Sequence, residues 1–283
     1  MSVSAPIGLR IRHPHFEVPD DFDPRWNRRA PEFACVANSV SLLMPYIEPY
    51  FVRSTRAVLE GPEGLEPDLR RRAEAYAAQE ASHHREHRRF NDLIRRRYRR
   101  LGAIERAVRR TYAWLGRTRS LEFSVAFAAA SECIAYTIAR WTADHYRDVL
   151  AGAAPVAHDL FMWHLAEEVE HKSVAFDIDR AYRHSGARYL GAGVVSLALL
   201  AVFSIASTVV MLARDHLLHR PTTWWRLLRW ALSFWFALAP ALAVSAMRSH
   251  HPSQLSDPSF YAAWLRSHDG AMSASDQGAL DVS

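Results

Sequence analysis

Apolar residues recur every three or four positions along most of the chain, which is the spacing of one face of an α-helix. The first such segment spans residues 32–59, where Pro45 and Pro49 lack an amide donor and should bend the predicted helix. Further helices are predicted for residues 67–98, 104–115, 120–146 and 156–184. Long helices with short connections indicate an all-α fold, and we assign residues 33–187 to a four-helix bundle.

The segment before the bundle differs from it in its proline content. Prolines recur every few residues within 1–32, and this spacing forbids a helix, so we expect an extended arm there. The same stretch is polar and lacks the apolar core of a signal peptide.

The hydropathy pattern changes again after the bundle, in residues 188–248. No charged residue occurs between Tyr189 and Ala213, or between Trp230 and Met247. At about 1.5 Å per residue, each stretch is long enough, or nearly so, to cross a hydrocarbon core of roughly 30 Å. We therefore expect an apolar helical hairpin appended to the bundle.

Two environments could cover this hairpin: a membrane, or protein surface on the bundle or in a homodimer. Arginines and two adjacent tryptophans, Trp224 and Trp225, lie between its two apolar stretches and are typical of a bilayer interface. Membrane contact is the favoured interpretation. The remaining residues, 249–283, are expected to form a short helix and a flexible tail.

Composition narrows the class of protein further. Hydrophobic residues make up 49% and charged residues 23% of the chain, which excludes a disordered or fibrous protein. Only two cysteines occur, Cys35 and Cys133, so neither a disulfide scaffold nor a thiolate metal site is expected. The net charge of +5 comes from arginine-rich helix faces without the interleaved aromatics of a nucleic-acid module, and no nucleic-acid partner is expected.

Two predicted helices carry the same chemical motif. Glu80 and His83 are three residues apart, and Glu168 and His171 repeat that spacing. Residues at this spacing share one helix face, so facing bundle helices could each offer a carboxylate and an imidazole to a metal ion. This donor set suits Fe, Mn or Zn.

A paired metal site also needs one glutamate from each remaining long helix. Glu48 is the only acidic residue between Leu42 and Leu59, and Glu132 interrupts an apolar surface. An acid on an apolar face is costly to bury unless it is paired or binds a metal. The two lone glutamates therefore complete a predicted six-residue site.

The number of ligands in this site is left open by neighbouring histidines and glutamates. His87 and His164 continue the same helix faces and could be extra ligands or could orient a ligand. Glu167 and Glu170 are expected to face outward, because only Glu168 repeats the offset of the first motif.

The chain resembles a bacterial family described as predicted metal-dependent hydrolases. The resemblance covers about residues 10–250 and rests on the segments 44–51, 79–91 and 163–177, the last being the most specific. Ile47 departs from the glycine usual before the first glutamate. The resemblance implies a ferritin-like bundle whose motif residues here are Glu48, Glu80, His83, Glu132, Glu168 and His171.

Several reactions fit such a site. We expect two metal ions, with iron favoured over manganese or zinc, and oxidation of an apolar or lipid-like substrate by dioxygen, with electrons from an unidentified donor. Hydrolysis by a metal-bound water is the first alternative, and metal storage without catalysis is the second. The expected location is the cytoplasm or the cytoplasmic side of the inner membrane.

Overall fold

The structure is a computed structural model, and it describes residues 9–12, 14–62, 64–247 and 251–267. It is all-α, as predicted. The α-helices are α1 (Pro31–Ser41), α2 (Met44–Leu59), α3 (Pro67–Arg97), α4 (Leu101–Thr118), α5 (Leu121–Asp144), α6 (Tyr146–Val149), α7 (Pro155–Ala181), α8 (Gly186–Arg214) and α9 (Pro221–Ser245), and a 3₁₀ turn, η1 (Pro252–Gln254), follows them.

Local sequence explains where the long helices begin. Pro67 and Pro155 occupy the first turns of α3 and α7, where a missing amide proton costs no helical hydrogen bond. The Ser120 side chain accepts a hydrogen bond of 3.2 Å from the amide of Phe123 and so caps α5.

The single bent helix predicted for residues 32–59 is wrong. The chain forms two helices, α1 and α2, separated at Leu42 and Leu43. Pro45 lies in the first turn of α2, where it is tolerated, and only Pro49 lies inside a helix. Both Leu42 and Leu43 are buried, so this break lies within the core.

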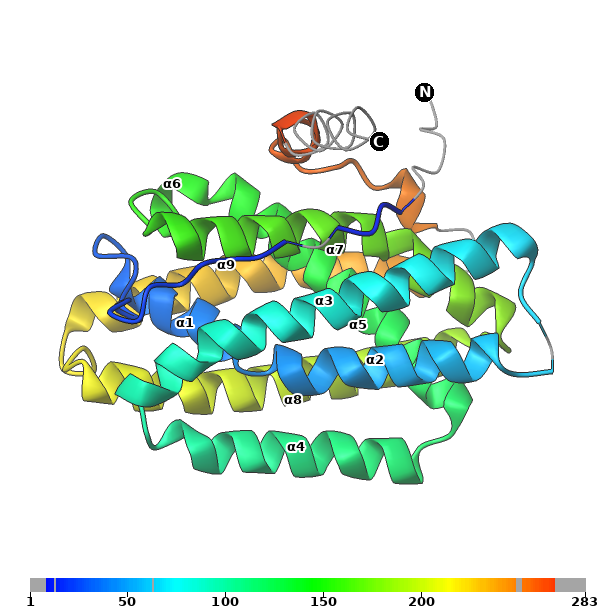
Figure 1. The fold of residues 1–283 in the computed structure, drawn as a ribbon, viewed down its shortest axis with the longest axis horizontal. Helices are drawn as coiled ribbons and strands as arrows, with labels where there is room; N and C mark the ends of the chain where they lie inside the picture. Colours follow the sequence, from blue (N-terminus) through cyan, green and yellow to red (C-terminus); the bar gives the residue numbers. More distant parts are fainter. Residues whose placement is uncertain (1–8, 13, 63, 248–250, 268–283) are drawn as a thin grey trace, which may run out of the picture.

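Four helices form the bundle that holds the candidate site. α2 packs on α3, α3 on α7, α7 on α5, and α5 packs back on α2. Figure 1 shows these helices running side by side along the length of the molecule. One long helix face from each of the four therefore meets at a common interior.

The apolar helices α8 and α9 form a further layer on this bundle. α8 packs on α5 and α1, and α9 packs mainly on α5. Gly193 of α8 lies where an added Cβ would come within 3.1 Å of Leu242 on α9 and 3.3 Å of Ala130 on α5. Three helices meet closely there, and Ala130 of α5 packs against α8.

The segments at both ends of the described chain lie over the bundle. No helix forms in residues 9–12 and 14–30, where Trp26 is buried and donates a hydrogen bond of 2.8 Å to Asn38. At the other end residues 261–267 are helical. The expected flexible tail falls mostly on residues 268–283, which lie outside the described residues.

Candidate metal centre

Six predicted residues converge inside the bundle. α3 contributes Glu80 and His83, α7 contributes Glu168 and His171, and α2 and α5 contribute one glutamate each. All six side chains are buried. Four carboxylates gathered away from water repel one another strongly unless positive charge or hydrogen bonds compensate them.

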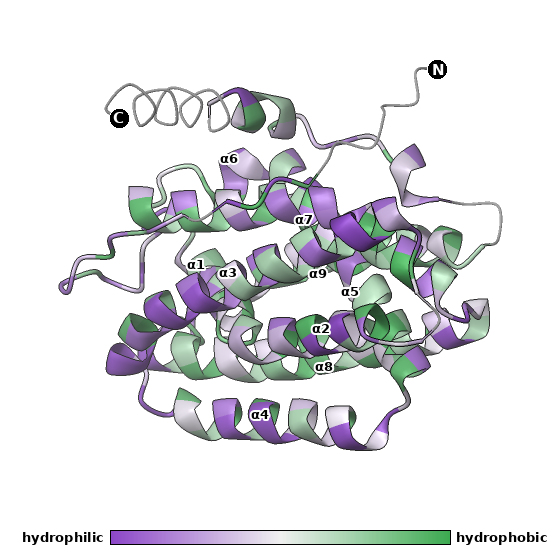
Figure 2. Cartoon of the chain, turned by 45° about the vertical axis from the view of Figure 1, so that its right-hand side comes forward, coloured by the Kyte–Doolittle hydropathy of each residue, from purple (hydrophilic) through white to green (hydrophobic). Residues whose placement is uncertain are grey.

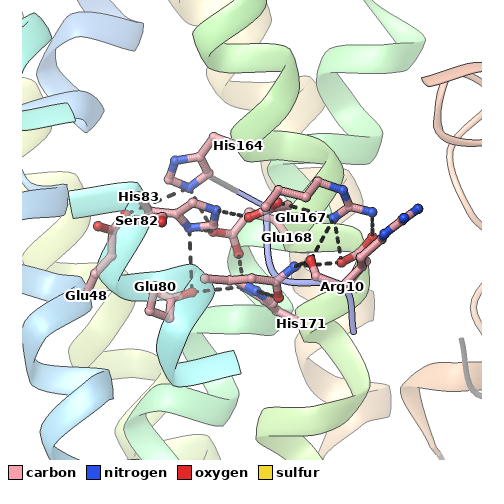
Figure 3. A network of polar contacts seen from close by, with 12 residues as sticks. Arg10, Glu48, Glu80, Ser82, His83, His164, Glu167, Glu168 and His171 are labelled. Carbon is pink, nitrogen blue, oxygen red and sulfur yellow. Dashed lines mark hydrogen bonds and ion pairs between the residues drawn. The ribbon is translucent and has the colours of Figure 1, made fainter. Parts of the chain in front are cut away.

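The distances within this group are those of a site with a shared centre. The Nδ1 atom of His171 lies 2.9 Å from Glu80 Oε1 and 3.7 Å from an oxygen of Glu168. The Nδ1 atom of His83 lies 3.7 Å from an oxygen of each of the same two glutamates. One ligand atom from each of these four residues lies within 4.8 Å of the other three, and Figure 3 shows the side chains facing one another.

The atoms that face this centre lack hydrogen-bond partners. Within the described part of the chain, none is found for eight buried atoms: both carboxylate oxygens of Glu48 and of Glu80, Oε2 of Glu132 and of Glu168, and Nδ1 of His83 and of His171. Buried polar atoms are nearly always satisfied in native proteins, so eight exceptions in one place require a missing partner. A metal centre fits them, because each is a metal-ligand atom.

Hydrogen bonds on the far side of each ring fix two of the histidines for this role. Gln79 donates from Nε2 to the backbone carbonyl of Arg10 at 3.0 Å, so its Oε1 accepts from Nε2 of His171 at 2.9 Å. His83 donates from Nε2 to Glu167 at 2.9 Å. With the proton on Nε2, each ring presents the lone pair of Nδ1 to the centre.

A longer chain of hydrogen bonds orients His164. Asn91 donates from Nδ2 to the carbonyl of Ser41 at 2.8 Å, so its Oδ1 accepts from the Ser41 hydroxyl at 2.7 Å. That hydroxyl oxygen then accepts from Nδ1 of His87 at 2.8 Å, and His87 Nε2 accepts from Nδ1 of His164 at 2.5 Å. The chain starts at a carbonyl, which can only accept, so every proton in it is assigned.

The outcome differs for the two extra histidines of the sequence prediction. Nε2 of His164 keeps its lone pair and lies 2.7 Å from Glu168 Oε1 and 4.0 Å from Glu48 Oε1. Both ring nitrogens of His87 are already used in the chain. In this geometry His164 is a seventh ligand candidate beside Glu48, and His87 orients it.

The pKa values follow from this burial and crowding. Burial raises the pKa of Glu48 and Glu132 well above its usual value, and neighbouring carboxylates add to the rise. Burial lowers the pKa of His83 and His87, which keeps both rings neutral as metal binding requires. Burial also opposes charge on His171, but the nearby carboxylates of Glu168 and Glu80 favour its charged form more strongly and raise that pKa.

The expectation that Glu167 and Glu170 face outward is wrong. The Glu167 side chain is fully buried, and that of Glu170 is 4% exposed. Arg12, from the extended arm, donates to Glu167 at 3.2 Å and to Glu170 at 2.9 Å. The arm covers this side of the bundle and supplies the cation that makes burial of the two acids tolerable.

Sequence reasoning missed several residues that support the ligands. Besides Arg12 they are Ser41, Tyr76 and Gln79; the Tyr76 hydroxyl donates to Glu132 at 2.6 Å. Glu167 could have been found, because it is four residues before His171 and shares its helix face. Arg12 lies more than 150 positions before its partners in sequence, and no pattern links them.

A buried centre of carboxylates and imidazoles within a helical bundle is the arrangement of a metal-binding protein. The chain belongs to the family described as predicted metal-dependent hydrolases, which matches residues 10–256. No curated protein and no solved structure is similar enough to count as a match. The family and the geometry agree on metal dependence.

Proposed function

We propose that the chain is an enzyme with a ferritin-like two-metal carboxylate centre and that its metal is iron. The eight buried ligand atoms without hydrogen-bond partners carry this proposal. Glu48, Glu80, Glu132 and Glu168 together carry four negative charges when ionised, and two divalent cations would balance them. One cation alone would leave a net charge in an apolar interior, which is unfavourable.

The ligands divide between two positions. Glu80, His83, Glu168 and His171 form one group, while Glu48 and His164, which His87 orients, form a second. Glu168 approaches His83 and His164 through the same oxygen, so it is placed to bridge the two positions. Carboxylate bridges of this kind are a feature of di-iron and di-manganese bundle proteins.

The proposed reaction is oxidation of an apolar or lipid-like substrate. Bound iron would supply the dioxygen chemistry, with electrons from a donor outside the chain. The protein's own side chains would exclude water and hold the ligands in fixed tautomers.

Hydrolysis is the second candidate, because the family carries that description. With zinc or manganese, water would be the nucleophile and a carboxylate of raised pKa such as Glu132 could hold a proton. The two candidates differ in the metal and in the need for a reductant.

Metal analysis of the purified full-length protein is the first test. We expect about two ions per chain, with iron the major one, and loss of both in Glu80→Ala/Glu168→Ala. The matched control is Glu74→Ala/Asp159→Ala, which removes two exposed acids from the same helices and should keep both ions. Full metal content in the first variant would contradict the site.

The reaction class needs a second measurement. The reduced iron form should consume dioxygen faster when membrane lipid is added, and the zinc form should be inert toward ester and amide substrates. An inert iron form beside a hydrolytically active zinc form would overturn the oxidative proposal and support hydrolysis.

A further inference from the structure

The outer surfaces of α8 and α9 are apolar over most of their length. Every exposed residue from 189 to 213 is apolar or glycine, and so is every exposed residue from 230 to 247. Large side chains carry this surface: Val202 and Ile205 on α8 are 61% and 63% exposed, and Trp225 and Phe236 on α9 are 66% and 74% exposed. We call it the apolar face; a contiguous apolar surface of this kind marks a binding interface.

Core packing does not account for these helices. α5 is also long and apolar enough to cross a membrane, and 72% of its most apolar window is buried in the bundle. The corresponding shares are 22% for α8 and 17% for α9. The apolar composition of α5 is explained by the protein interior, and that of α8 and α9 needs a partner outside the chain.

Polar contacts show which sides of the two helices belong to the protein. On α8, Ser196 bonds Ser131 of α5 at 2.7 Å, and Thr208 bonds Ser39 of α1 at 3.1 Å. On α9, Thr223 donates to Glu32 of α1 at 3.0 Å. Ser233 of α9 accepts from Trp141 of α5 at 2.9 Å, and Ser245 lies 3.4 Å from the Cys133 sulfur. The hairpin is therefore attached to the bundle along its whole length.

This attachment limits the orientations in which α8 and α9 could contact a bilayer. α3 belongs to the bundle to which the hairpin is attached (Figure 2). Its exposed residues are all charged apart from Pro67 at its start. If α8 and α9 crossed the bilayer in this arrangement, that charged surface would enter the hydrocarbon, which is strongly unfavourable. Lying in the plane of one leaflet lets the apolar face enter the lipid while α3 stays in water.

The charges beside the apolar face favour an anionic surface. Arg214 and Arg220 are exposed at the turn between α8 and α9, and no acidic residue occurs from 216 to 247. Exposed Trp224 and Trp225 adjoin these arginines, and tryptophan and arginine are enriched where hydrocarbon meets headgroups. A second copy of the chain would present the same positive turn and would not complement it.

We propose that the protein binds in-plane to anionic phospholipid bilayers through the apolar face of α8 and α9, with the α8–α9 turn at the headgroups. This surface is separate from the metal centre, so the proposal stands or fails independently of the reaction. Membrane binding by this surface is a property that the residues of the metal centre do not imply.

Vesicle flotation of the full-length protein tests the proposal. Phosphatidylcholine vesicles containing phosphatidylglycerol should bind the protein more tightly than phosphatidylcholine alone, with or without metal. Val202→Glu/Phe236→Glu should weaken binding by about tenfold or more for each position, because each change replaces a large apolar group that would enter the lipid with a charged one. Trp114→Glu, a change to an exposed aromatic on α4, is the control and should bind as the parent does.

Two further measurements complete the test. Arg214→Gln/Arg220→Gln should reduce the preference for anionic vesicles by about fivefold per arginine and leave binding to neutral ones unchanged. Alkaline carbonate should release the bound protein. Failure to bind either kind of vesicle overturns the proposal. If the protein is then found to be a dimer, and Val202→Glu/Phe236→Glu makes it monomeric, a second copy of the chain covers the apolar face. Resistance to carbonate extraction would overturn the in-plane orientation.

Discussion

The bundle core and the α8–α9 hairpin depart from the usual distribution of residues in opposite ways. The candidate metal centre and its surroundings bury five glutamates, Glu167 included, and four histidines, which proteins normally keep at the surface. The hairpin exposes valine, tryptophan and phenylalanine, which proteins normally bury. Each arrangement is unfavourable in water by itself, so each points to something that compensates it.

The missing compensation differs in kind between the two regions. Inside the bundle eight unsatisfied oxygen and nitrogen atoms gather around one small volume and have lone pairs to offer, which is the requirement of a cation. On the hairpin the exposed groups are spread over two long helices and are predominantly hydrocarbon, which is the requirement of an extended apolar phase. One chain thus contains two separate binding regions, a small polar centre suited to metal ions and an extended apolar surface suited to lipid.

The strongest way to break this comparison is to remove the core's carboxylates. Glu80→Ala/Glu168→Ala should lose essentially all bound metal, while vesicle binding by the hairpin stays at the parent level. Both glutamates belong to the first ligand group, and Glu168 also lies beside His164 of the second. Metal analysis and flotation on the same preparation measure both properties. A joint loss of metal and vesicle binding, with normal helical content, would show that the two regions are coupled.

Metal removal should change how the stability of the core depends on pH. The folded apoprotein holds protons on Glu48, Glu132 and His171 more tightly than the unfolded chain does, because their pKa values are raised. The lowered pKa values of His83 and His87 oppose this effect progressively less as pH rises above about 6.5, because both residues then become neutral in the unfolded chain too.

The apoprotein should therefore lose stability as pH rises above about 6.5, by up to about 1.4 kcal/mol per pH unit for each proton released on unfolding. The metal-loaded protein should lack this slope, because its ligands are already deprotonated. Denaturant unfolding between pH 6.5 and 9, with and without chelator, measures the difference. An apoprotein stability that rises with pH would contradict the assigned charges.

A smaller effect is expected from the hydrogen-bond chain behind His164. Ser41→Ala removes the acceptor that holds the proton on Nδ1 of His87, so His164 is no longer fixed in the ligand tautomer. We expect one of the two metals to bind about 10- to 100-fold more weakly. Metal titration resolves the two affinities, and Ser54→Ala on α2, whose hydroxyl bonds only a backbone carbonyl of its own helix, is the control.

The smallest effect should come from the hairpin's outer side. Phe236→Ala should change the free energy of unfolding by about 0.5 kcal/mol or less, because the side chain is 74% exposed. Leu238→Ala, two residues along the same helix, should cost about 2–5 kcal/mol, because Leu238 is buried against α5. Equal losses at the two positions would mean that Phe236 packs against protein in solution.

The sequence by itself determined which residues the candidate metal centre brings together. Two Glu-x-x-His motifs place their side chains on one face of a helix through helical periodicity alone, and isolated glutamates on apolar faces stand out because burying them is costly. The same periodicity gave the helices and the apolar stretches of the hairpin. Local spacing was sufficient for each of these predictions.

Tertiary structure decided the properties that depend on contacts between distant segments. It divided the expected first helix at Leu42 and Leu43, turned Glu167 and Glu170 inward toward Arg12, and separated the roles of His87 and His164. It also attached the hairpin to the bundle along its length, so that only one side of each helix remains exposed. Such outcomes depend on which partner another helix or the arm supplies, and a single sequence carries no local signal of that partner.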